Sequence, residues 1–153
     1  MKEDEKYMDT AGIKTAILTA LGILGGFLSN LFGGWSASLT TLLIVMGMDY
    51  LSGLIVAGIF HRSDKTADGT LKSGAGWKGL CRKGMMLLVV LVGARLDLIM
   101  GTSIVRDGVI IAFVANECIS IIENAGLMGI PIPAVIAKAI SVLNGGDRPG
   151  DAD

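Results

Sequence analysis

Apolar residues are gathered into four long stretches that together fill most of the chain. A helix needs about 20 predominantly apolar residues to cross the roughly 30 Å hydrocarbon core of a bilayer. The pattern therefore predicts an all-α, polytopic membrane protein with about four transmembrane helices, or three if the polar last stretch fails to cross. The predicted spans are residues 11–34, 39–60, 85–105 and 109–128.

The first apolar stretch contains small residues at helical spacing, three of which recur at every fourth position. Such a stripe lets two helices approach closely in lipid, so it predicts a helix-packing face. Glycine is also common in membrane helices generally, which leaves a second explanation for any one pair. The stretch is longer than the apolar part of a secretory signal peptide, so we expect a retained helix. The predicted packing residues are Gly22, Gly25, Gly26, Ser29 and Gly33.

Composition supports a membrane location and excludes a nucleic-acid partner. Of the 153 residues, 52% are hydrophobic and 18% charged, and the mean hydropathy is +0.64, which is too apolar for a soluble domain of this length. The net charge of −1 leaves no broad basic face for binding nucleic acid. Cys81 lies in a basic segment and Cys118 in an apolar one, so both are predicted to be free thiols.

Basic residues are concentrated between the second and third stretches, in residues 61–84. This segment carries six lysines and arginines against two aspartates. Because cytoplasmic loops collect lysine and arginine, we predict that the segment and the N-terminus are cytoplasmic. Its glycine-rich run at 73–79 lacks the spacing of a phosphate-binding loop. We instead predict contact with the membrane surface by Trp77, Lys78, Arg82 and Lys83.

Ionisable residues inside the apolar stretches are the candidate functional residues, because charges at bilayer depth are costly and usually functional. Asp49 shares a helix face with small residues, so we expect it to point inward. Arg95 and Asp97 fall on opposite sides of one helix, so each needs a partner on another helix. The last stretch places five polar residues within an arc of about 120°, which fits either helix packing or pore lining. These five are Asn116, Glu117, Ser120, Glu123 and Asn124.

Two prolines, Pro131 and Pro133, end the fourth stretch, since each removes an amide donor and disfavours helix in the residue before it. Residues 134–143 then predict a short apolar helix lying on the membrane surface. Residues 144–153 are rich in Gly and Asp and are predicted to be disordered. The sequence thus predicts one membrane domain over residues 1–143, followed by a tail.

Four short segments carry a resemblance to a known family. At 49–53, 79–83, 116–124 and 129–133 the chain reads Asp-Tyr-Leu-Ser-Gly, Gly-Leu-Cys-Arg-Lys, Asn-Glu-Cys-Ile-Ser-Ile-Ile-Glu-Asn and Gly-Ile-Pro-Ile-Pro. In this order and spacing the chain resembles the toxin-secretion and phage-lysis holin family over about residues 15–143. The resemblance implies a phage-encoded or phage-derived protein that oligomerises into lesions in the bacterial inner membrane. It implies as partners the protein itself, the lipid bilayer, an antiholin, and a released endolysin or toxin, with no cofactor and no catalytic residue.

Other classes of function fit the same pattern of buried charge. A small proton- or ion-coupled transporter would use buried carboxylates such as Glu117, and a structural or assembly factor would leave the membrane sealed. An enzyme is not expected, since the sequence offers no nucleophile and base, metal cluster or phosphate loop. Met8 offers a second start that would drop the charged leader 2–6, although an ordinary methionine in a frayed leader is the alternative.

Overall fold

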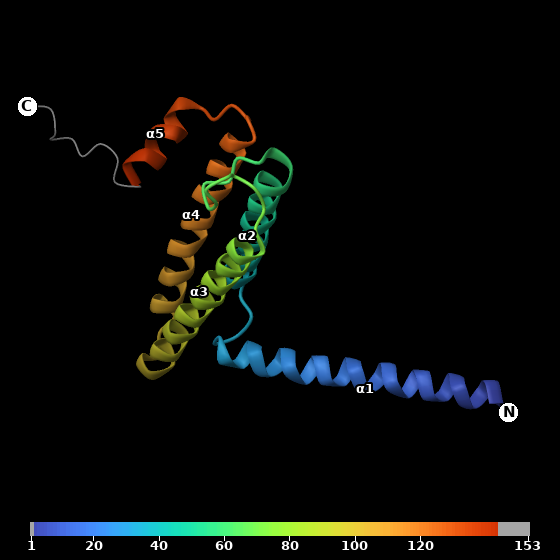
Figure 1. The fold of residues 1–153 in the computed structure, drawn as a ribbon. Coiled ribbons are helices and arrows are strands. Elements are labelled where there is room, and N and C mark those ends of the chain that lie inside the picture. The colour runs from blue at the N-terminus through green and yellow to red at the C-terminus, as the bar shows by residue number, and fades with distance from the viewer. Residues whose placement is uncertain (1, 144–153) are drawn as a thin grey trace, which may run out of the picture.

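The computed structural model describes residues 2–143, and the side chains of residues 11–142 within that range. Over residues 2–143 the chain is helical without any strand, which confirms the predicted all-α class (Figure 1). The predicted disordered tail, 144–153, lies outside the described residues. The elements are α1 (Lys2–Leu31), α2 (Ala37–Ile55), the π-helical turn η1 (Val56–Phe60), α3 (Ser73–Met100), α4 (Ile104–Leu127) and α5 (Ala134–Leu143).

Helices α2, α3 and α4 lie side by side as a three-helix bundle in which α4 contacts both of the others (Figure 1). The buried apolar residues of α2 are Leu39, Leu42 and Met46, which are three and four positions apart. Val90 of α3 and Ile110 of α4 join them in one core. An apolar stripe at this spacing turns one face of each helix toward the bundle axis, so the core follows directly from the sequence pattern.

A glycine lets α3 and α4 cross closely. A Cβ atom added at Gly93 would lie 3.2 Å from the Cα atom of Arg106, which is closer than nine in ten real Cβ contacts. Gly93 is itself buried. Any side chain at this position would push the two helix backbones apart, so the crossing of α3 and α4 depends on the missing Cβ atom.

Helix α1 projects away from the bundle and approaches it near its own C-terminal end (Figure 1). The apolar segment Ala11–Leu31 is not buried inside the protomer. A Cβ atom added at Gly22, Gly25 or Gly26 would meet no atom within 4 Å. These three glycines therefore touch no other described segment, whereas Ser29 is half-buried and lines, together with Gly26, a hollow beside Ala94 and Arg95 of α3. A packing role of the stripe between copies stays a prediction.

Two glycines end α1 and correct one of the packing assignments. Gly33 and Gly34 have φ angles of 74° and 97°, in the left-handed region that glycine adopts without strain. The amide of Gly34 donates a hydrogen bond to the carbonyl of Ser29 at 2.8 Å, which closes the helix end. Gly33, predicted as a packing residue of the first span, thus lies beyond the helix and terminates it.

Two helical segments, Ala11–Leu31 and Ala37–Phe60, are long and apolar enough to cross a membrane. Helix α3 has 28 residues and α4 has 24, which correspond to about 42 Å and 36 Å of helix and exceed the roughly 30 Å hydrocarbon core. Their length suffices, but each also carries buried polar side chains. Crossing by α3 and α4, and the membrane-surface position of α5, stay predictions.

The helix boundaries differ from the predicted ones around α3. The predicted span 85–105 runs through a turn, because Gly101 at φ 67° ends α3 and a new helix starts at Ile104. Helix α3 also begins earlier, at Ser73, so only the first half of the predicted basic loop is irregular. In these early turns α3 lies against α2, since a Cβ atom at Gly76 would lie 3.5 Å from the Oη atom of Tyr50, at ordinary contact distance.

Candidate functional site

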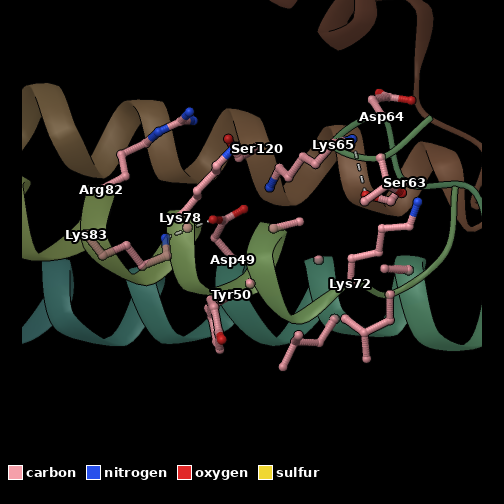
Figure 2. A pocket seen from close by; sticks show the side chains of 18 of the residues that line it. Asp49, Tyr50, Ser63, Asp64, Lys65, Lys72, Lys78, Arg82, Lys83 and Ser120 are labelled. Carbon is pink, nitrogen blue, oxygen red and sulfur yellow. Dashed lines mark hydrogen bonds and ion pairs between the residues drawn. The ribbon is translucent and has the colours of Figure 1, made fainter. Parts of the chain in front are cut away.

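The centre of the bundle holds a buried ion pair network. Lys83 of α3 donates hydrogen bonds from Nζ to Oδ2 of Asp49 on α2, at 2.8 Å, and to Oε2 of Glu117 on α4. Asp49, Lys83 and Glu117 are only 7%, 8% and 3% exposed. Figure 2 shows the Lys83 ammonium directed at the Asp49 carboxylate. One lysine therefore joins all three helices of the bundle.

An amide and a hydroxyl complete this network. Nδ2 of Asn124 donates to Oδ1 of Asp49 at 3.2 Å and to Oγ of Ser52 at 2.8 Å. The Ser52 hydroxyl in turn donates to the backbone carbonyl of Asp49 at 3.0 Å. Among the side chains of residues 11–142, no buried nitrogen or oxygen lacks a hydrogen-bond partner. This closure is what allows the bundle to bury charge, because an unpartnered polar group would be costly. We call Asp49, Ser52, Lys83, Glu117 and Asn124 the ion cluster.

Lys83 was assigned wrongly by the sequence pattern, which placed it in a basic surface loop. The residue lies in the third turn of α3 and is buried together with Met86, Val90 and Asp97 of the same helix. The spacing from Lys83 to Val90 and on to Asp97 is seven residues, or two helical turns, which keeps one face toward the bundle. This seven-residue spacing is visible in the sequence, but it places Lys83 on the buried face only if the helix is known to start at Ser73.

The charges of the ion cluster do not balance when all are ionised, since two carboxylates share one ammonium. Burying a charge is costly unless it is paired and hydrogen-bonded. Removing the cation would leave two acids facing each other without a counter-charge. Removing one acid would instead leave a neutral pair. We therefore expect removal of the cation and removal of one acid to lower the stability of the bundle by unequal amounts.

The predicted polar arc of α4 is divided by the packing. Glu117 and Asn124 are buried in the ion cluster, Ser120 is half-buried, and Asn116 and Glu123 are exposed. The division arises because α2 and α3 cover only part of the perimeter of α4. Asn116, Ser120 and Glu123 line a cavity beside the cluster instead. A pore-lining role for these five residues stays a prediction.

The cavity has a volume of about 370 Å³ and opens at the end of the bundle that carries the irregular segment 61–72. Its walls come from α2, this segment, the first turns of α3, and α4 (Figure 2). Lys65 and Lys78 extend toward its interior, near Ser120 and Asp49 (Figure 2). The charged side chains of the lining are Asp49, Asp64, Lys65, Lys72, Lys78, Arg82, Lys83, Glu117 and Glu123.

One cavity lysine is paired outward rather than toward the cavity. Nζ of Lys72 lies 2.9 Å from Oδ2 of Asp68, four residues earlier in the same irregular segment. Hydrogen bonds from Lys72 and Thr70 lower the pKa of Asp68 from its ordinary 3.8 to about 2. The segment is therefore braced by a carboxylate that stays ionised across the physiological range.

A second polar centre lies at the opposite end of the bundle, at the turn between α3 and α4. Asp97 accepts hydrogen bonds from Oγ1 of Thr102 at 2.5 Å and from the amides of Val105 and Arg106 at 3.1 and 2.7 Å. The carboxylate thus caps the N-terminus of α4, where the helix dipole favours negative charge. The predicted need of Asp97 for a partner on another helix is met by backbone amides rather than by a cation.

The arginines of this end bind the carbonyls that α1 leaves open. Nη2 of Arg95 donates to the carbonyls of Asn30, at 3.0 Å, and Leu31. Nη1 of Arg106 donates to the carbonyls of Phe32 and Gly33 at 3.1 and 3.0 Å. The last carbonyls of a helix lack internal partners and carry partial negative charge, so guanidinium groups stabilise them. Arg106 lay between the predicted spans, and sequence spacing gave no sign of this contact.

The remaining predicted residues lie on the surface of the bundle. Trp77, Lys78 and Arg82 are exposed, as membrane-surface contact requires, but that contact itself stays a prediction. Cys81 and Cys118 are free, as predicted. Among the described residues no three side chains of histidine, cysteine, aspartate or glutamate are placed to hold a metal ion.

Comparison with known proteins gives one family and several relatives. Residues 26–145 match the family model described as the bacteriophage holin family. A probable holin of Bacillus phage phi105 is 32% identical over 106 residues, covering 69% of this chain and 73% of that protein. An uncharacterized 14.9 kDa protein in the nagH 3' region of Clostridium perfringens is 36% identical and covers 79% and 87%. The uncharacterized protein Lin0175 of Listeria innocua is 35% identical and covers 84% and 88%. No solved structure matches.

Proposed function

Because this chain belongs to the bacteriophage holin family, we propose that it crosses the bacterial cytoplasmic membrane several times and oligomerises there into lesions. These lesions release a wall-degrading endolysin or a toxin from the cell. The observation that carries the proposal is the ion cluster, in which α2, α3 and α4 share charges that are hidden from lipid. The basic segment 61–72 and the start of α3 lie on the cytoplasmic side, following the distribution of lysine and arginine.

The physical basis of lesion formation is an exchange of partners by buried polar groups. In a single protomer Lys83 satisfies Asp49 and Glu117, so the charged groups can exist at bilayer depth. When many copies are crowded together, the same groups can pair between chains or face water. Such an exchange needs no apolar attraction between helices, which lipid does not provide. Lesions open when the exchanged helices enclose water rather than one another.

The first test records membrane potential in bacteria during induced expression, with and without a co-expressed endolysin. We expect an abrupt loss of potential at a defined time, with lysis only when the endolysin is present. A protein that depolarises nothing at full expression would contradict the proposal. Quantitative blotting of isolated membranes checks that the protein is present, so that an unchanged membrane potential is not caused by a lack of expression.

The second test addresses the residues of α4. Glu117→Leu removes a buried member of the ion cluster, and Glu123→Leu removes an exposed carboxylate of the cavity. We expect both to shift the time of lysis and the leakage of dye from vesicles. Ile111→Leu is the matched control, since it changes a 66% exposed apolar residue of the same helix. Unchanged timing and leakage in both glutamate variants would refute a pore-lining role.

A small ion-coupled transporter is the second candidate, and the cavity beside Glu117 favours it. A polar cavity that leads from one end of the bundle to a buried carboxylate is a feature that proton coupling uses. Transport predicts saturable, substrate-dependent flux without death of the host cell. A structural or assembly role predicts an intact potential in every assay. The depolarisation measurement separates these classes from a holin.

An antiholin partner is also part of the proposal, and the chain offers a source for it. Translation from Met8 would give a product without the charged leader 2–6. We expect two species of different N-terminus in membranes of expressing cells, with a changed lysis time in Met8→Leu. Mass spectrometry that finds only the species starting at Met1 would reject the second start.

A further inference from the structure

The irregular segment 61–72 is folded into a compact unit that is braced by its own hydrogen bonds. The amide of Ser63 donates to the carbonyl of Gly69 at 3.0 Å, and the hydroxyl of Thr66 donates to the carbonyl of Thr70 at 2.9 Å. The ion pair at the C-terminal end of the segment adds a further bond within it. A short loop that is held together by its own residues can move as one body.

The two ends of this segment are places where the backbone can turn. Its first residue, His61, follows the π-helical turn η1 and has a φ angle of 52°, which is uncommon for a residue that carries a side chain. Turns of π-helix are rare and frequently lie at functional sites. Its last residue, Lys72, is extended and precedes α3 without forming a side-chain cap. The segment is thus joined to η1 and to α3 by non-helical residues that can serve as hinges.

Lys65 reaches from this segment to the bundle. A Cβ atom added at Gly53 of α2 would lie 3.7 Å from Nζ of Lys65 and 3.8 Å from Nδ2 of Asn124 on α4. That same Nδ2 atom donates a hydrogen bond to Asp49. The ammonium of Lys65 therefore lies between α2 and α4 beside the ion cluster, where the absence of a side chain at Gly53 leaves room for it (Figure 2).

The charges around the cavity balance one another. Apart from Lys72, which binds Asp68, the lining found among the described residues carries four cations and four carboxylates. Opposite charges in equal number stabilise one another, so this lining has no surplus charge to offer a charged ligand. The balance favours a role within the protein itself. The cations are Lys65, Lys78, Arg82 and Lys83, and the carboxylates are Asp49, Asp64, Glu117 and Glu123.

Of these four cations only Lys65 belongs to segment 61–72, whereas the other three are fixed to α3. In the ion cluster two carboxylates share the ammonium of Lys83, so a second ammonium close by lowers the cost of burying the second carboxylate. Asp64 of the same segment is exposed and is directed away from Asp49 (Figure 2). Movement of the segment would therefore take positive charge away from the ion cluster.

Asp49 and Glu117 line the cavity, yet they are only 7% and 3% exposed, so the surrounding side chains shield them from water. We propose that segment 61–72 is a hinged strap, with Lys65 as its latch, that covers the ion cluster at this end of the bundle. When Lys65 withdraws, the strap swings away and water reaches both carboxylates. Opening of the strap would then free these acids to exchange partners between chains, a last step that rests on the proposed function.

The test measures access to the cavity through a cysteine at the half-buried lining position Ser120. The full-length chain carries Ser120→Cys together with Cys81→Ser and Cys118→Ser, and it is placed in phosphatidylcholine nanodiscs that leave both faces accessible. A small uncharged maleimide modifies the thiol, and mass spectrometry gives the rate. Adding Lys65→Gln should speed modification about twofold to fivefold, the factor expected for loss of one partly exposed charge interaction.

The matched control for Lys65→Gln is Arg62→Gln. It removes a cation from an exposed position of the same segment that is not part of the cavity lining, so the rate should stay unchanged. Loss of a nearby cation by itself would slow the reaction, because it lowers the thiolate fraction of the reporter. Faster modification in Lys65→Gln therefore reports access to the cavity and not a change in thiol reactivity.

Two further measurements separate a latch from a general loosening of the bundle. Raising the salt concentration from about 0.1 M to about 1 M shortens the screening length from about 10 Å to about 3 Å, so it should speed modification with Lys65 present and have little effect in Lys65→Gln. A second reporter, Val90→Cys in place of Ser120→Cys, lies in the core at a position with 0% exposure and should stay unmodified in every variant.

Equal rates in Lys65→Gln and Arg62→Gln, whether both unchanged or both raised, would overturn the latch. Faster modification at Val90 as well as at Ser120 would also overturn it, because the whole bundle would then be opening. The measurement reads access to the cavity of the purified protein and not permeability of a membrane. A latch confirmed in this way in a protein that never depolarises cells would refute the holin proposal alone.

Discussion

Replacing Lys83 by methionine should destabilise the bundle far more than replacing Glu117 by glutamine. Methionine retains most of the apolar stem but removes the cation from between two carboxylates whose side chains are only 9% and 4% exposed. Removing one partner of a buried ion pair costs about 3–5 kcal/mol, because the remaining charge is left uncompensated. Here two acids would be left, so the expected loss lies at the upper end of that range.

Glutamine at position 117 changes the net charge of the ion cluster in the opposite direction, because it removes a negative charge instead of the positive one. Its amide oxygen can still accept the hydrogen bond from Lys83, while Lys83 and Asp49 become a neutral pair. Single side-chain hydrogen bonds between membrane helices contribute about 0.6 kcal/mol, so Glu117→Gln should cost about 1 kcal/mol or less. Because the two acids share one ammonium, Lys83→Met combined with Glu117→Gln should cost less than the sum of the single changes.

The assay is reversible unfolding of the full chain in mixed micelles that contain an increasing fraction of a denaturing detergent. Circular dichroism monitors the loss of helix. The difference in unfolding free energy between the two single variants is expected to exceed about 2 kcal/mol. Equal destabilisation by both changes, or a larger loss from Glu117→Gln, would show that the second carboxylate is as necessary as the cation. The reasoning from unequal charge would then be refuted.

Three further predictions follow from the packing and the turns. Gly93→Ala should lower the free energy of unfolding by about 1–3 kcal/mol, because the added Cβ atom separates α3 from α4. Gly84→Ala on the same helix, where no atom lies within 4 Å of the added Cβ position, should not destabilise the protein. Chemical or detergent unfolding measures both variants. Arg106→Gln should expose the turn after α1, which amide hydrogen exchange detects as faster exchange there and not in the core. Lys72→Gln should raise the pKa of Asp68 from about 2 toward 3.8, as measured by NMR titration. Since that lowered pKa stabilises the segment above pH 3.8 and the stabilisation is lost as pH falls toward 2, the variant should lack this loss.

The helices could be read from the sequence because helix formation depends on neighbours a few residues away. Apolar spacing of three and four located the core face of α2, and the two prolines placed the end of the fourth stretch near the end of α4 at Leu127. The sequence also identified Asp49 and Glu117 as charges needing partners, since a carboxylate at bilayer depth is costly in any fold. Their identity as candidates required no tertiary information.

Only the tertiary structure decided which charges meet. Lys83 is 34 residues from both Asp49 and Glu117, and no local periodicity relates positions so far apart. Its inclusion in the ion cluster depends on α3 starting at Ser73 and packing against α2 and α4. The binding of Arg106 to carbonyls 73 and 74 residues away likewise depends on how α4 meets the end of α1. Sequence determined that charges had to be buried, and the packing of three helices determined how they are neutralised.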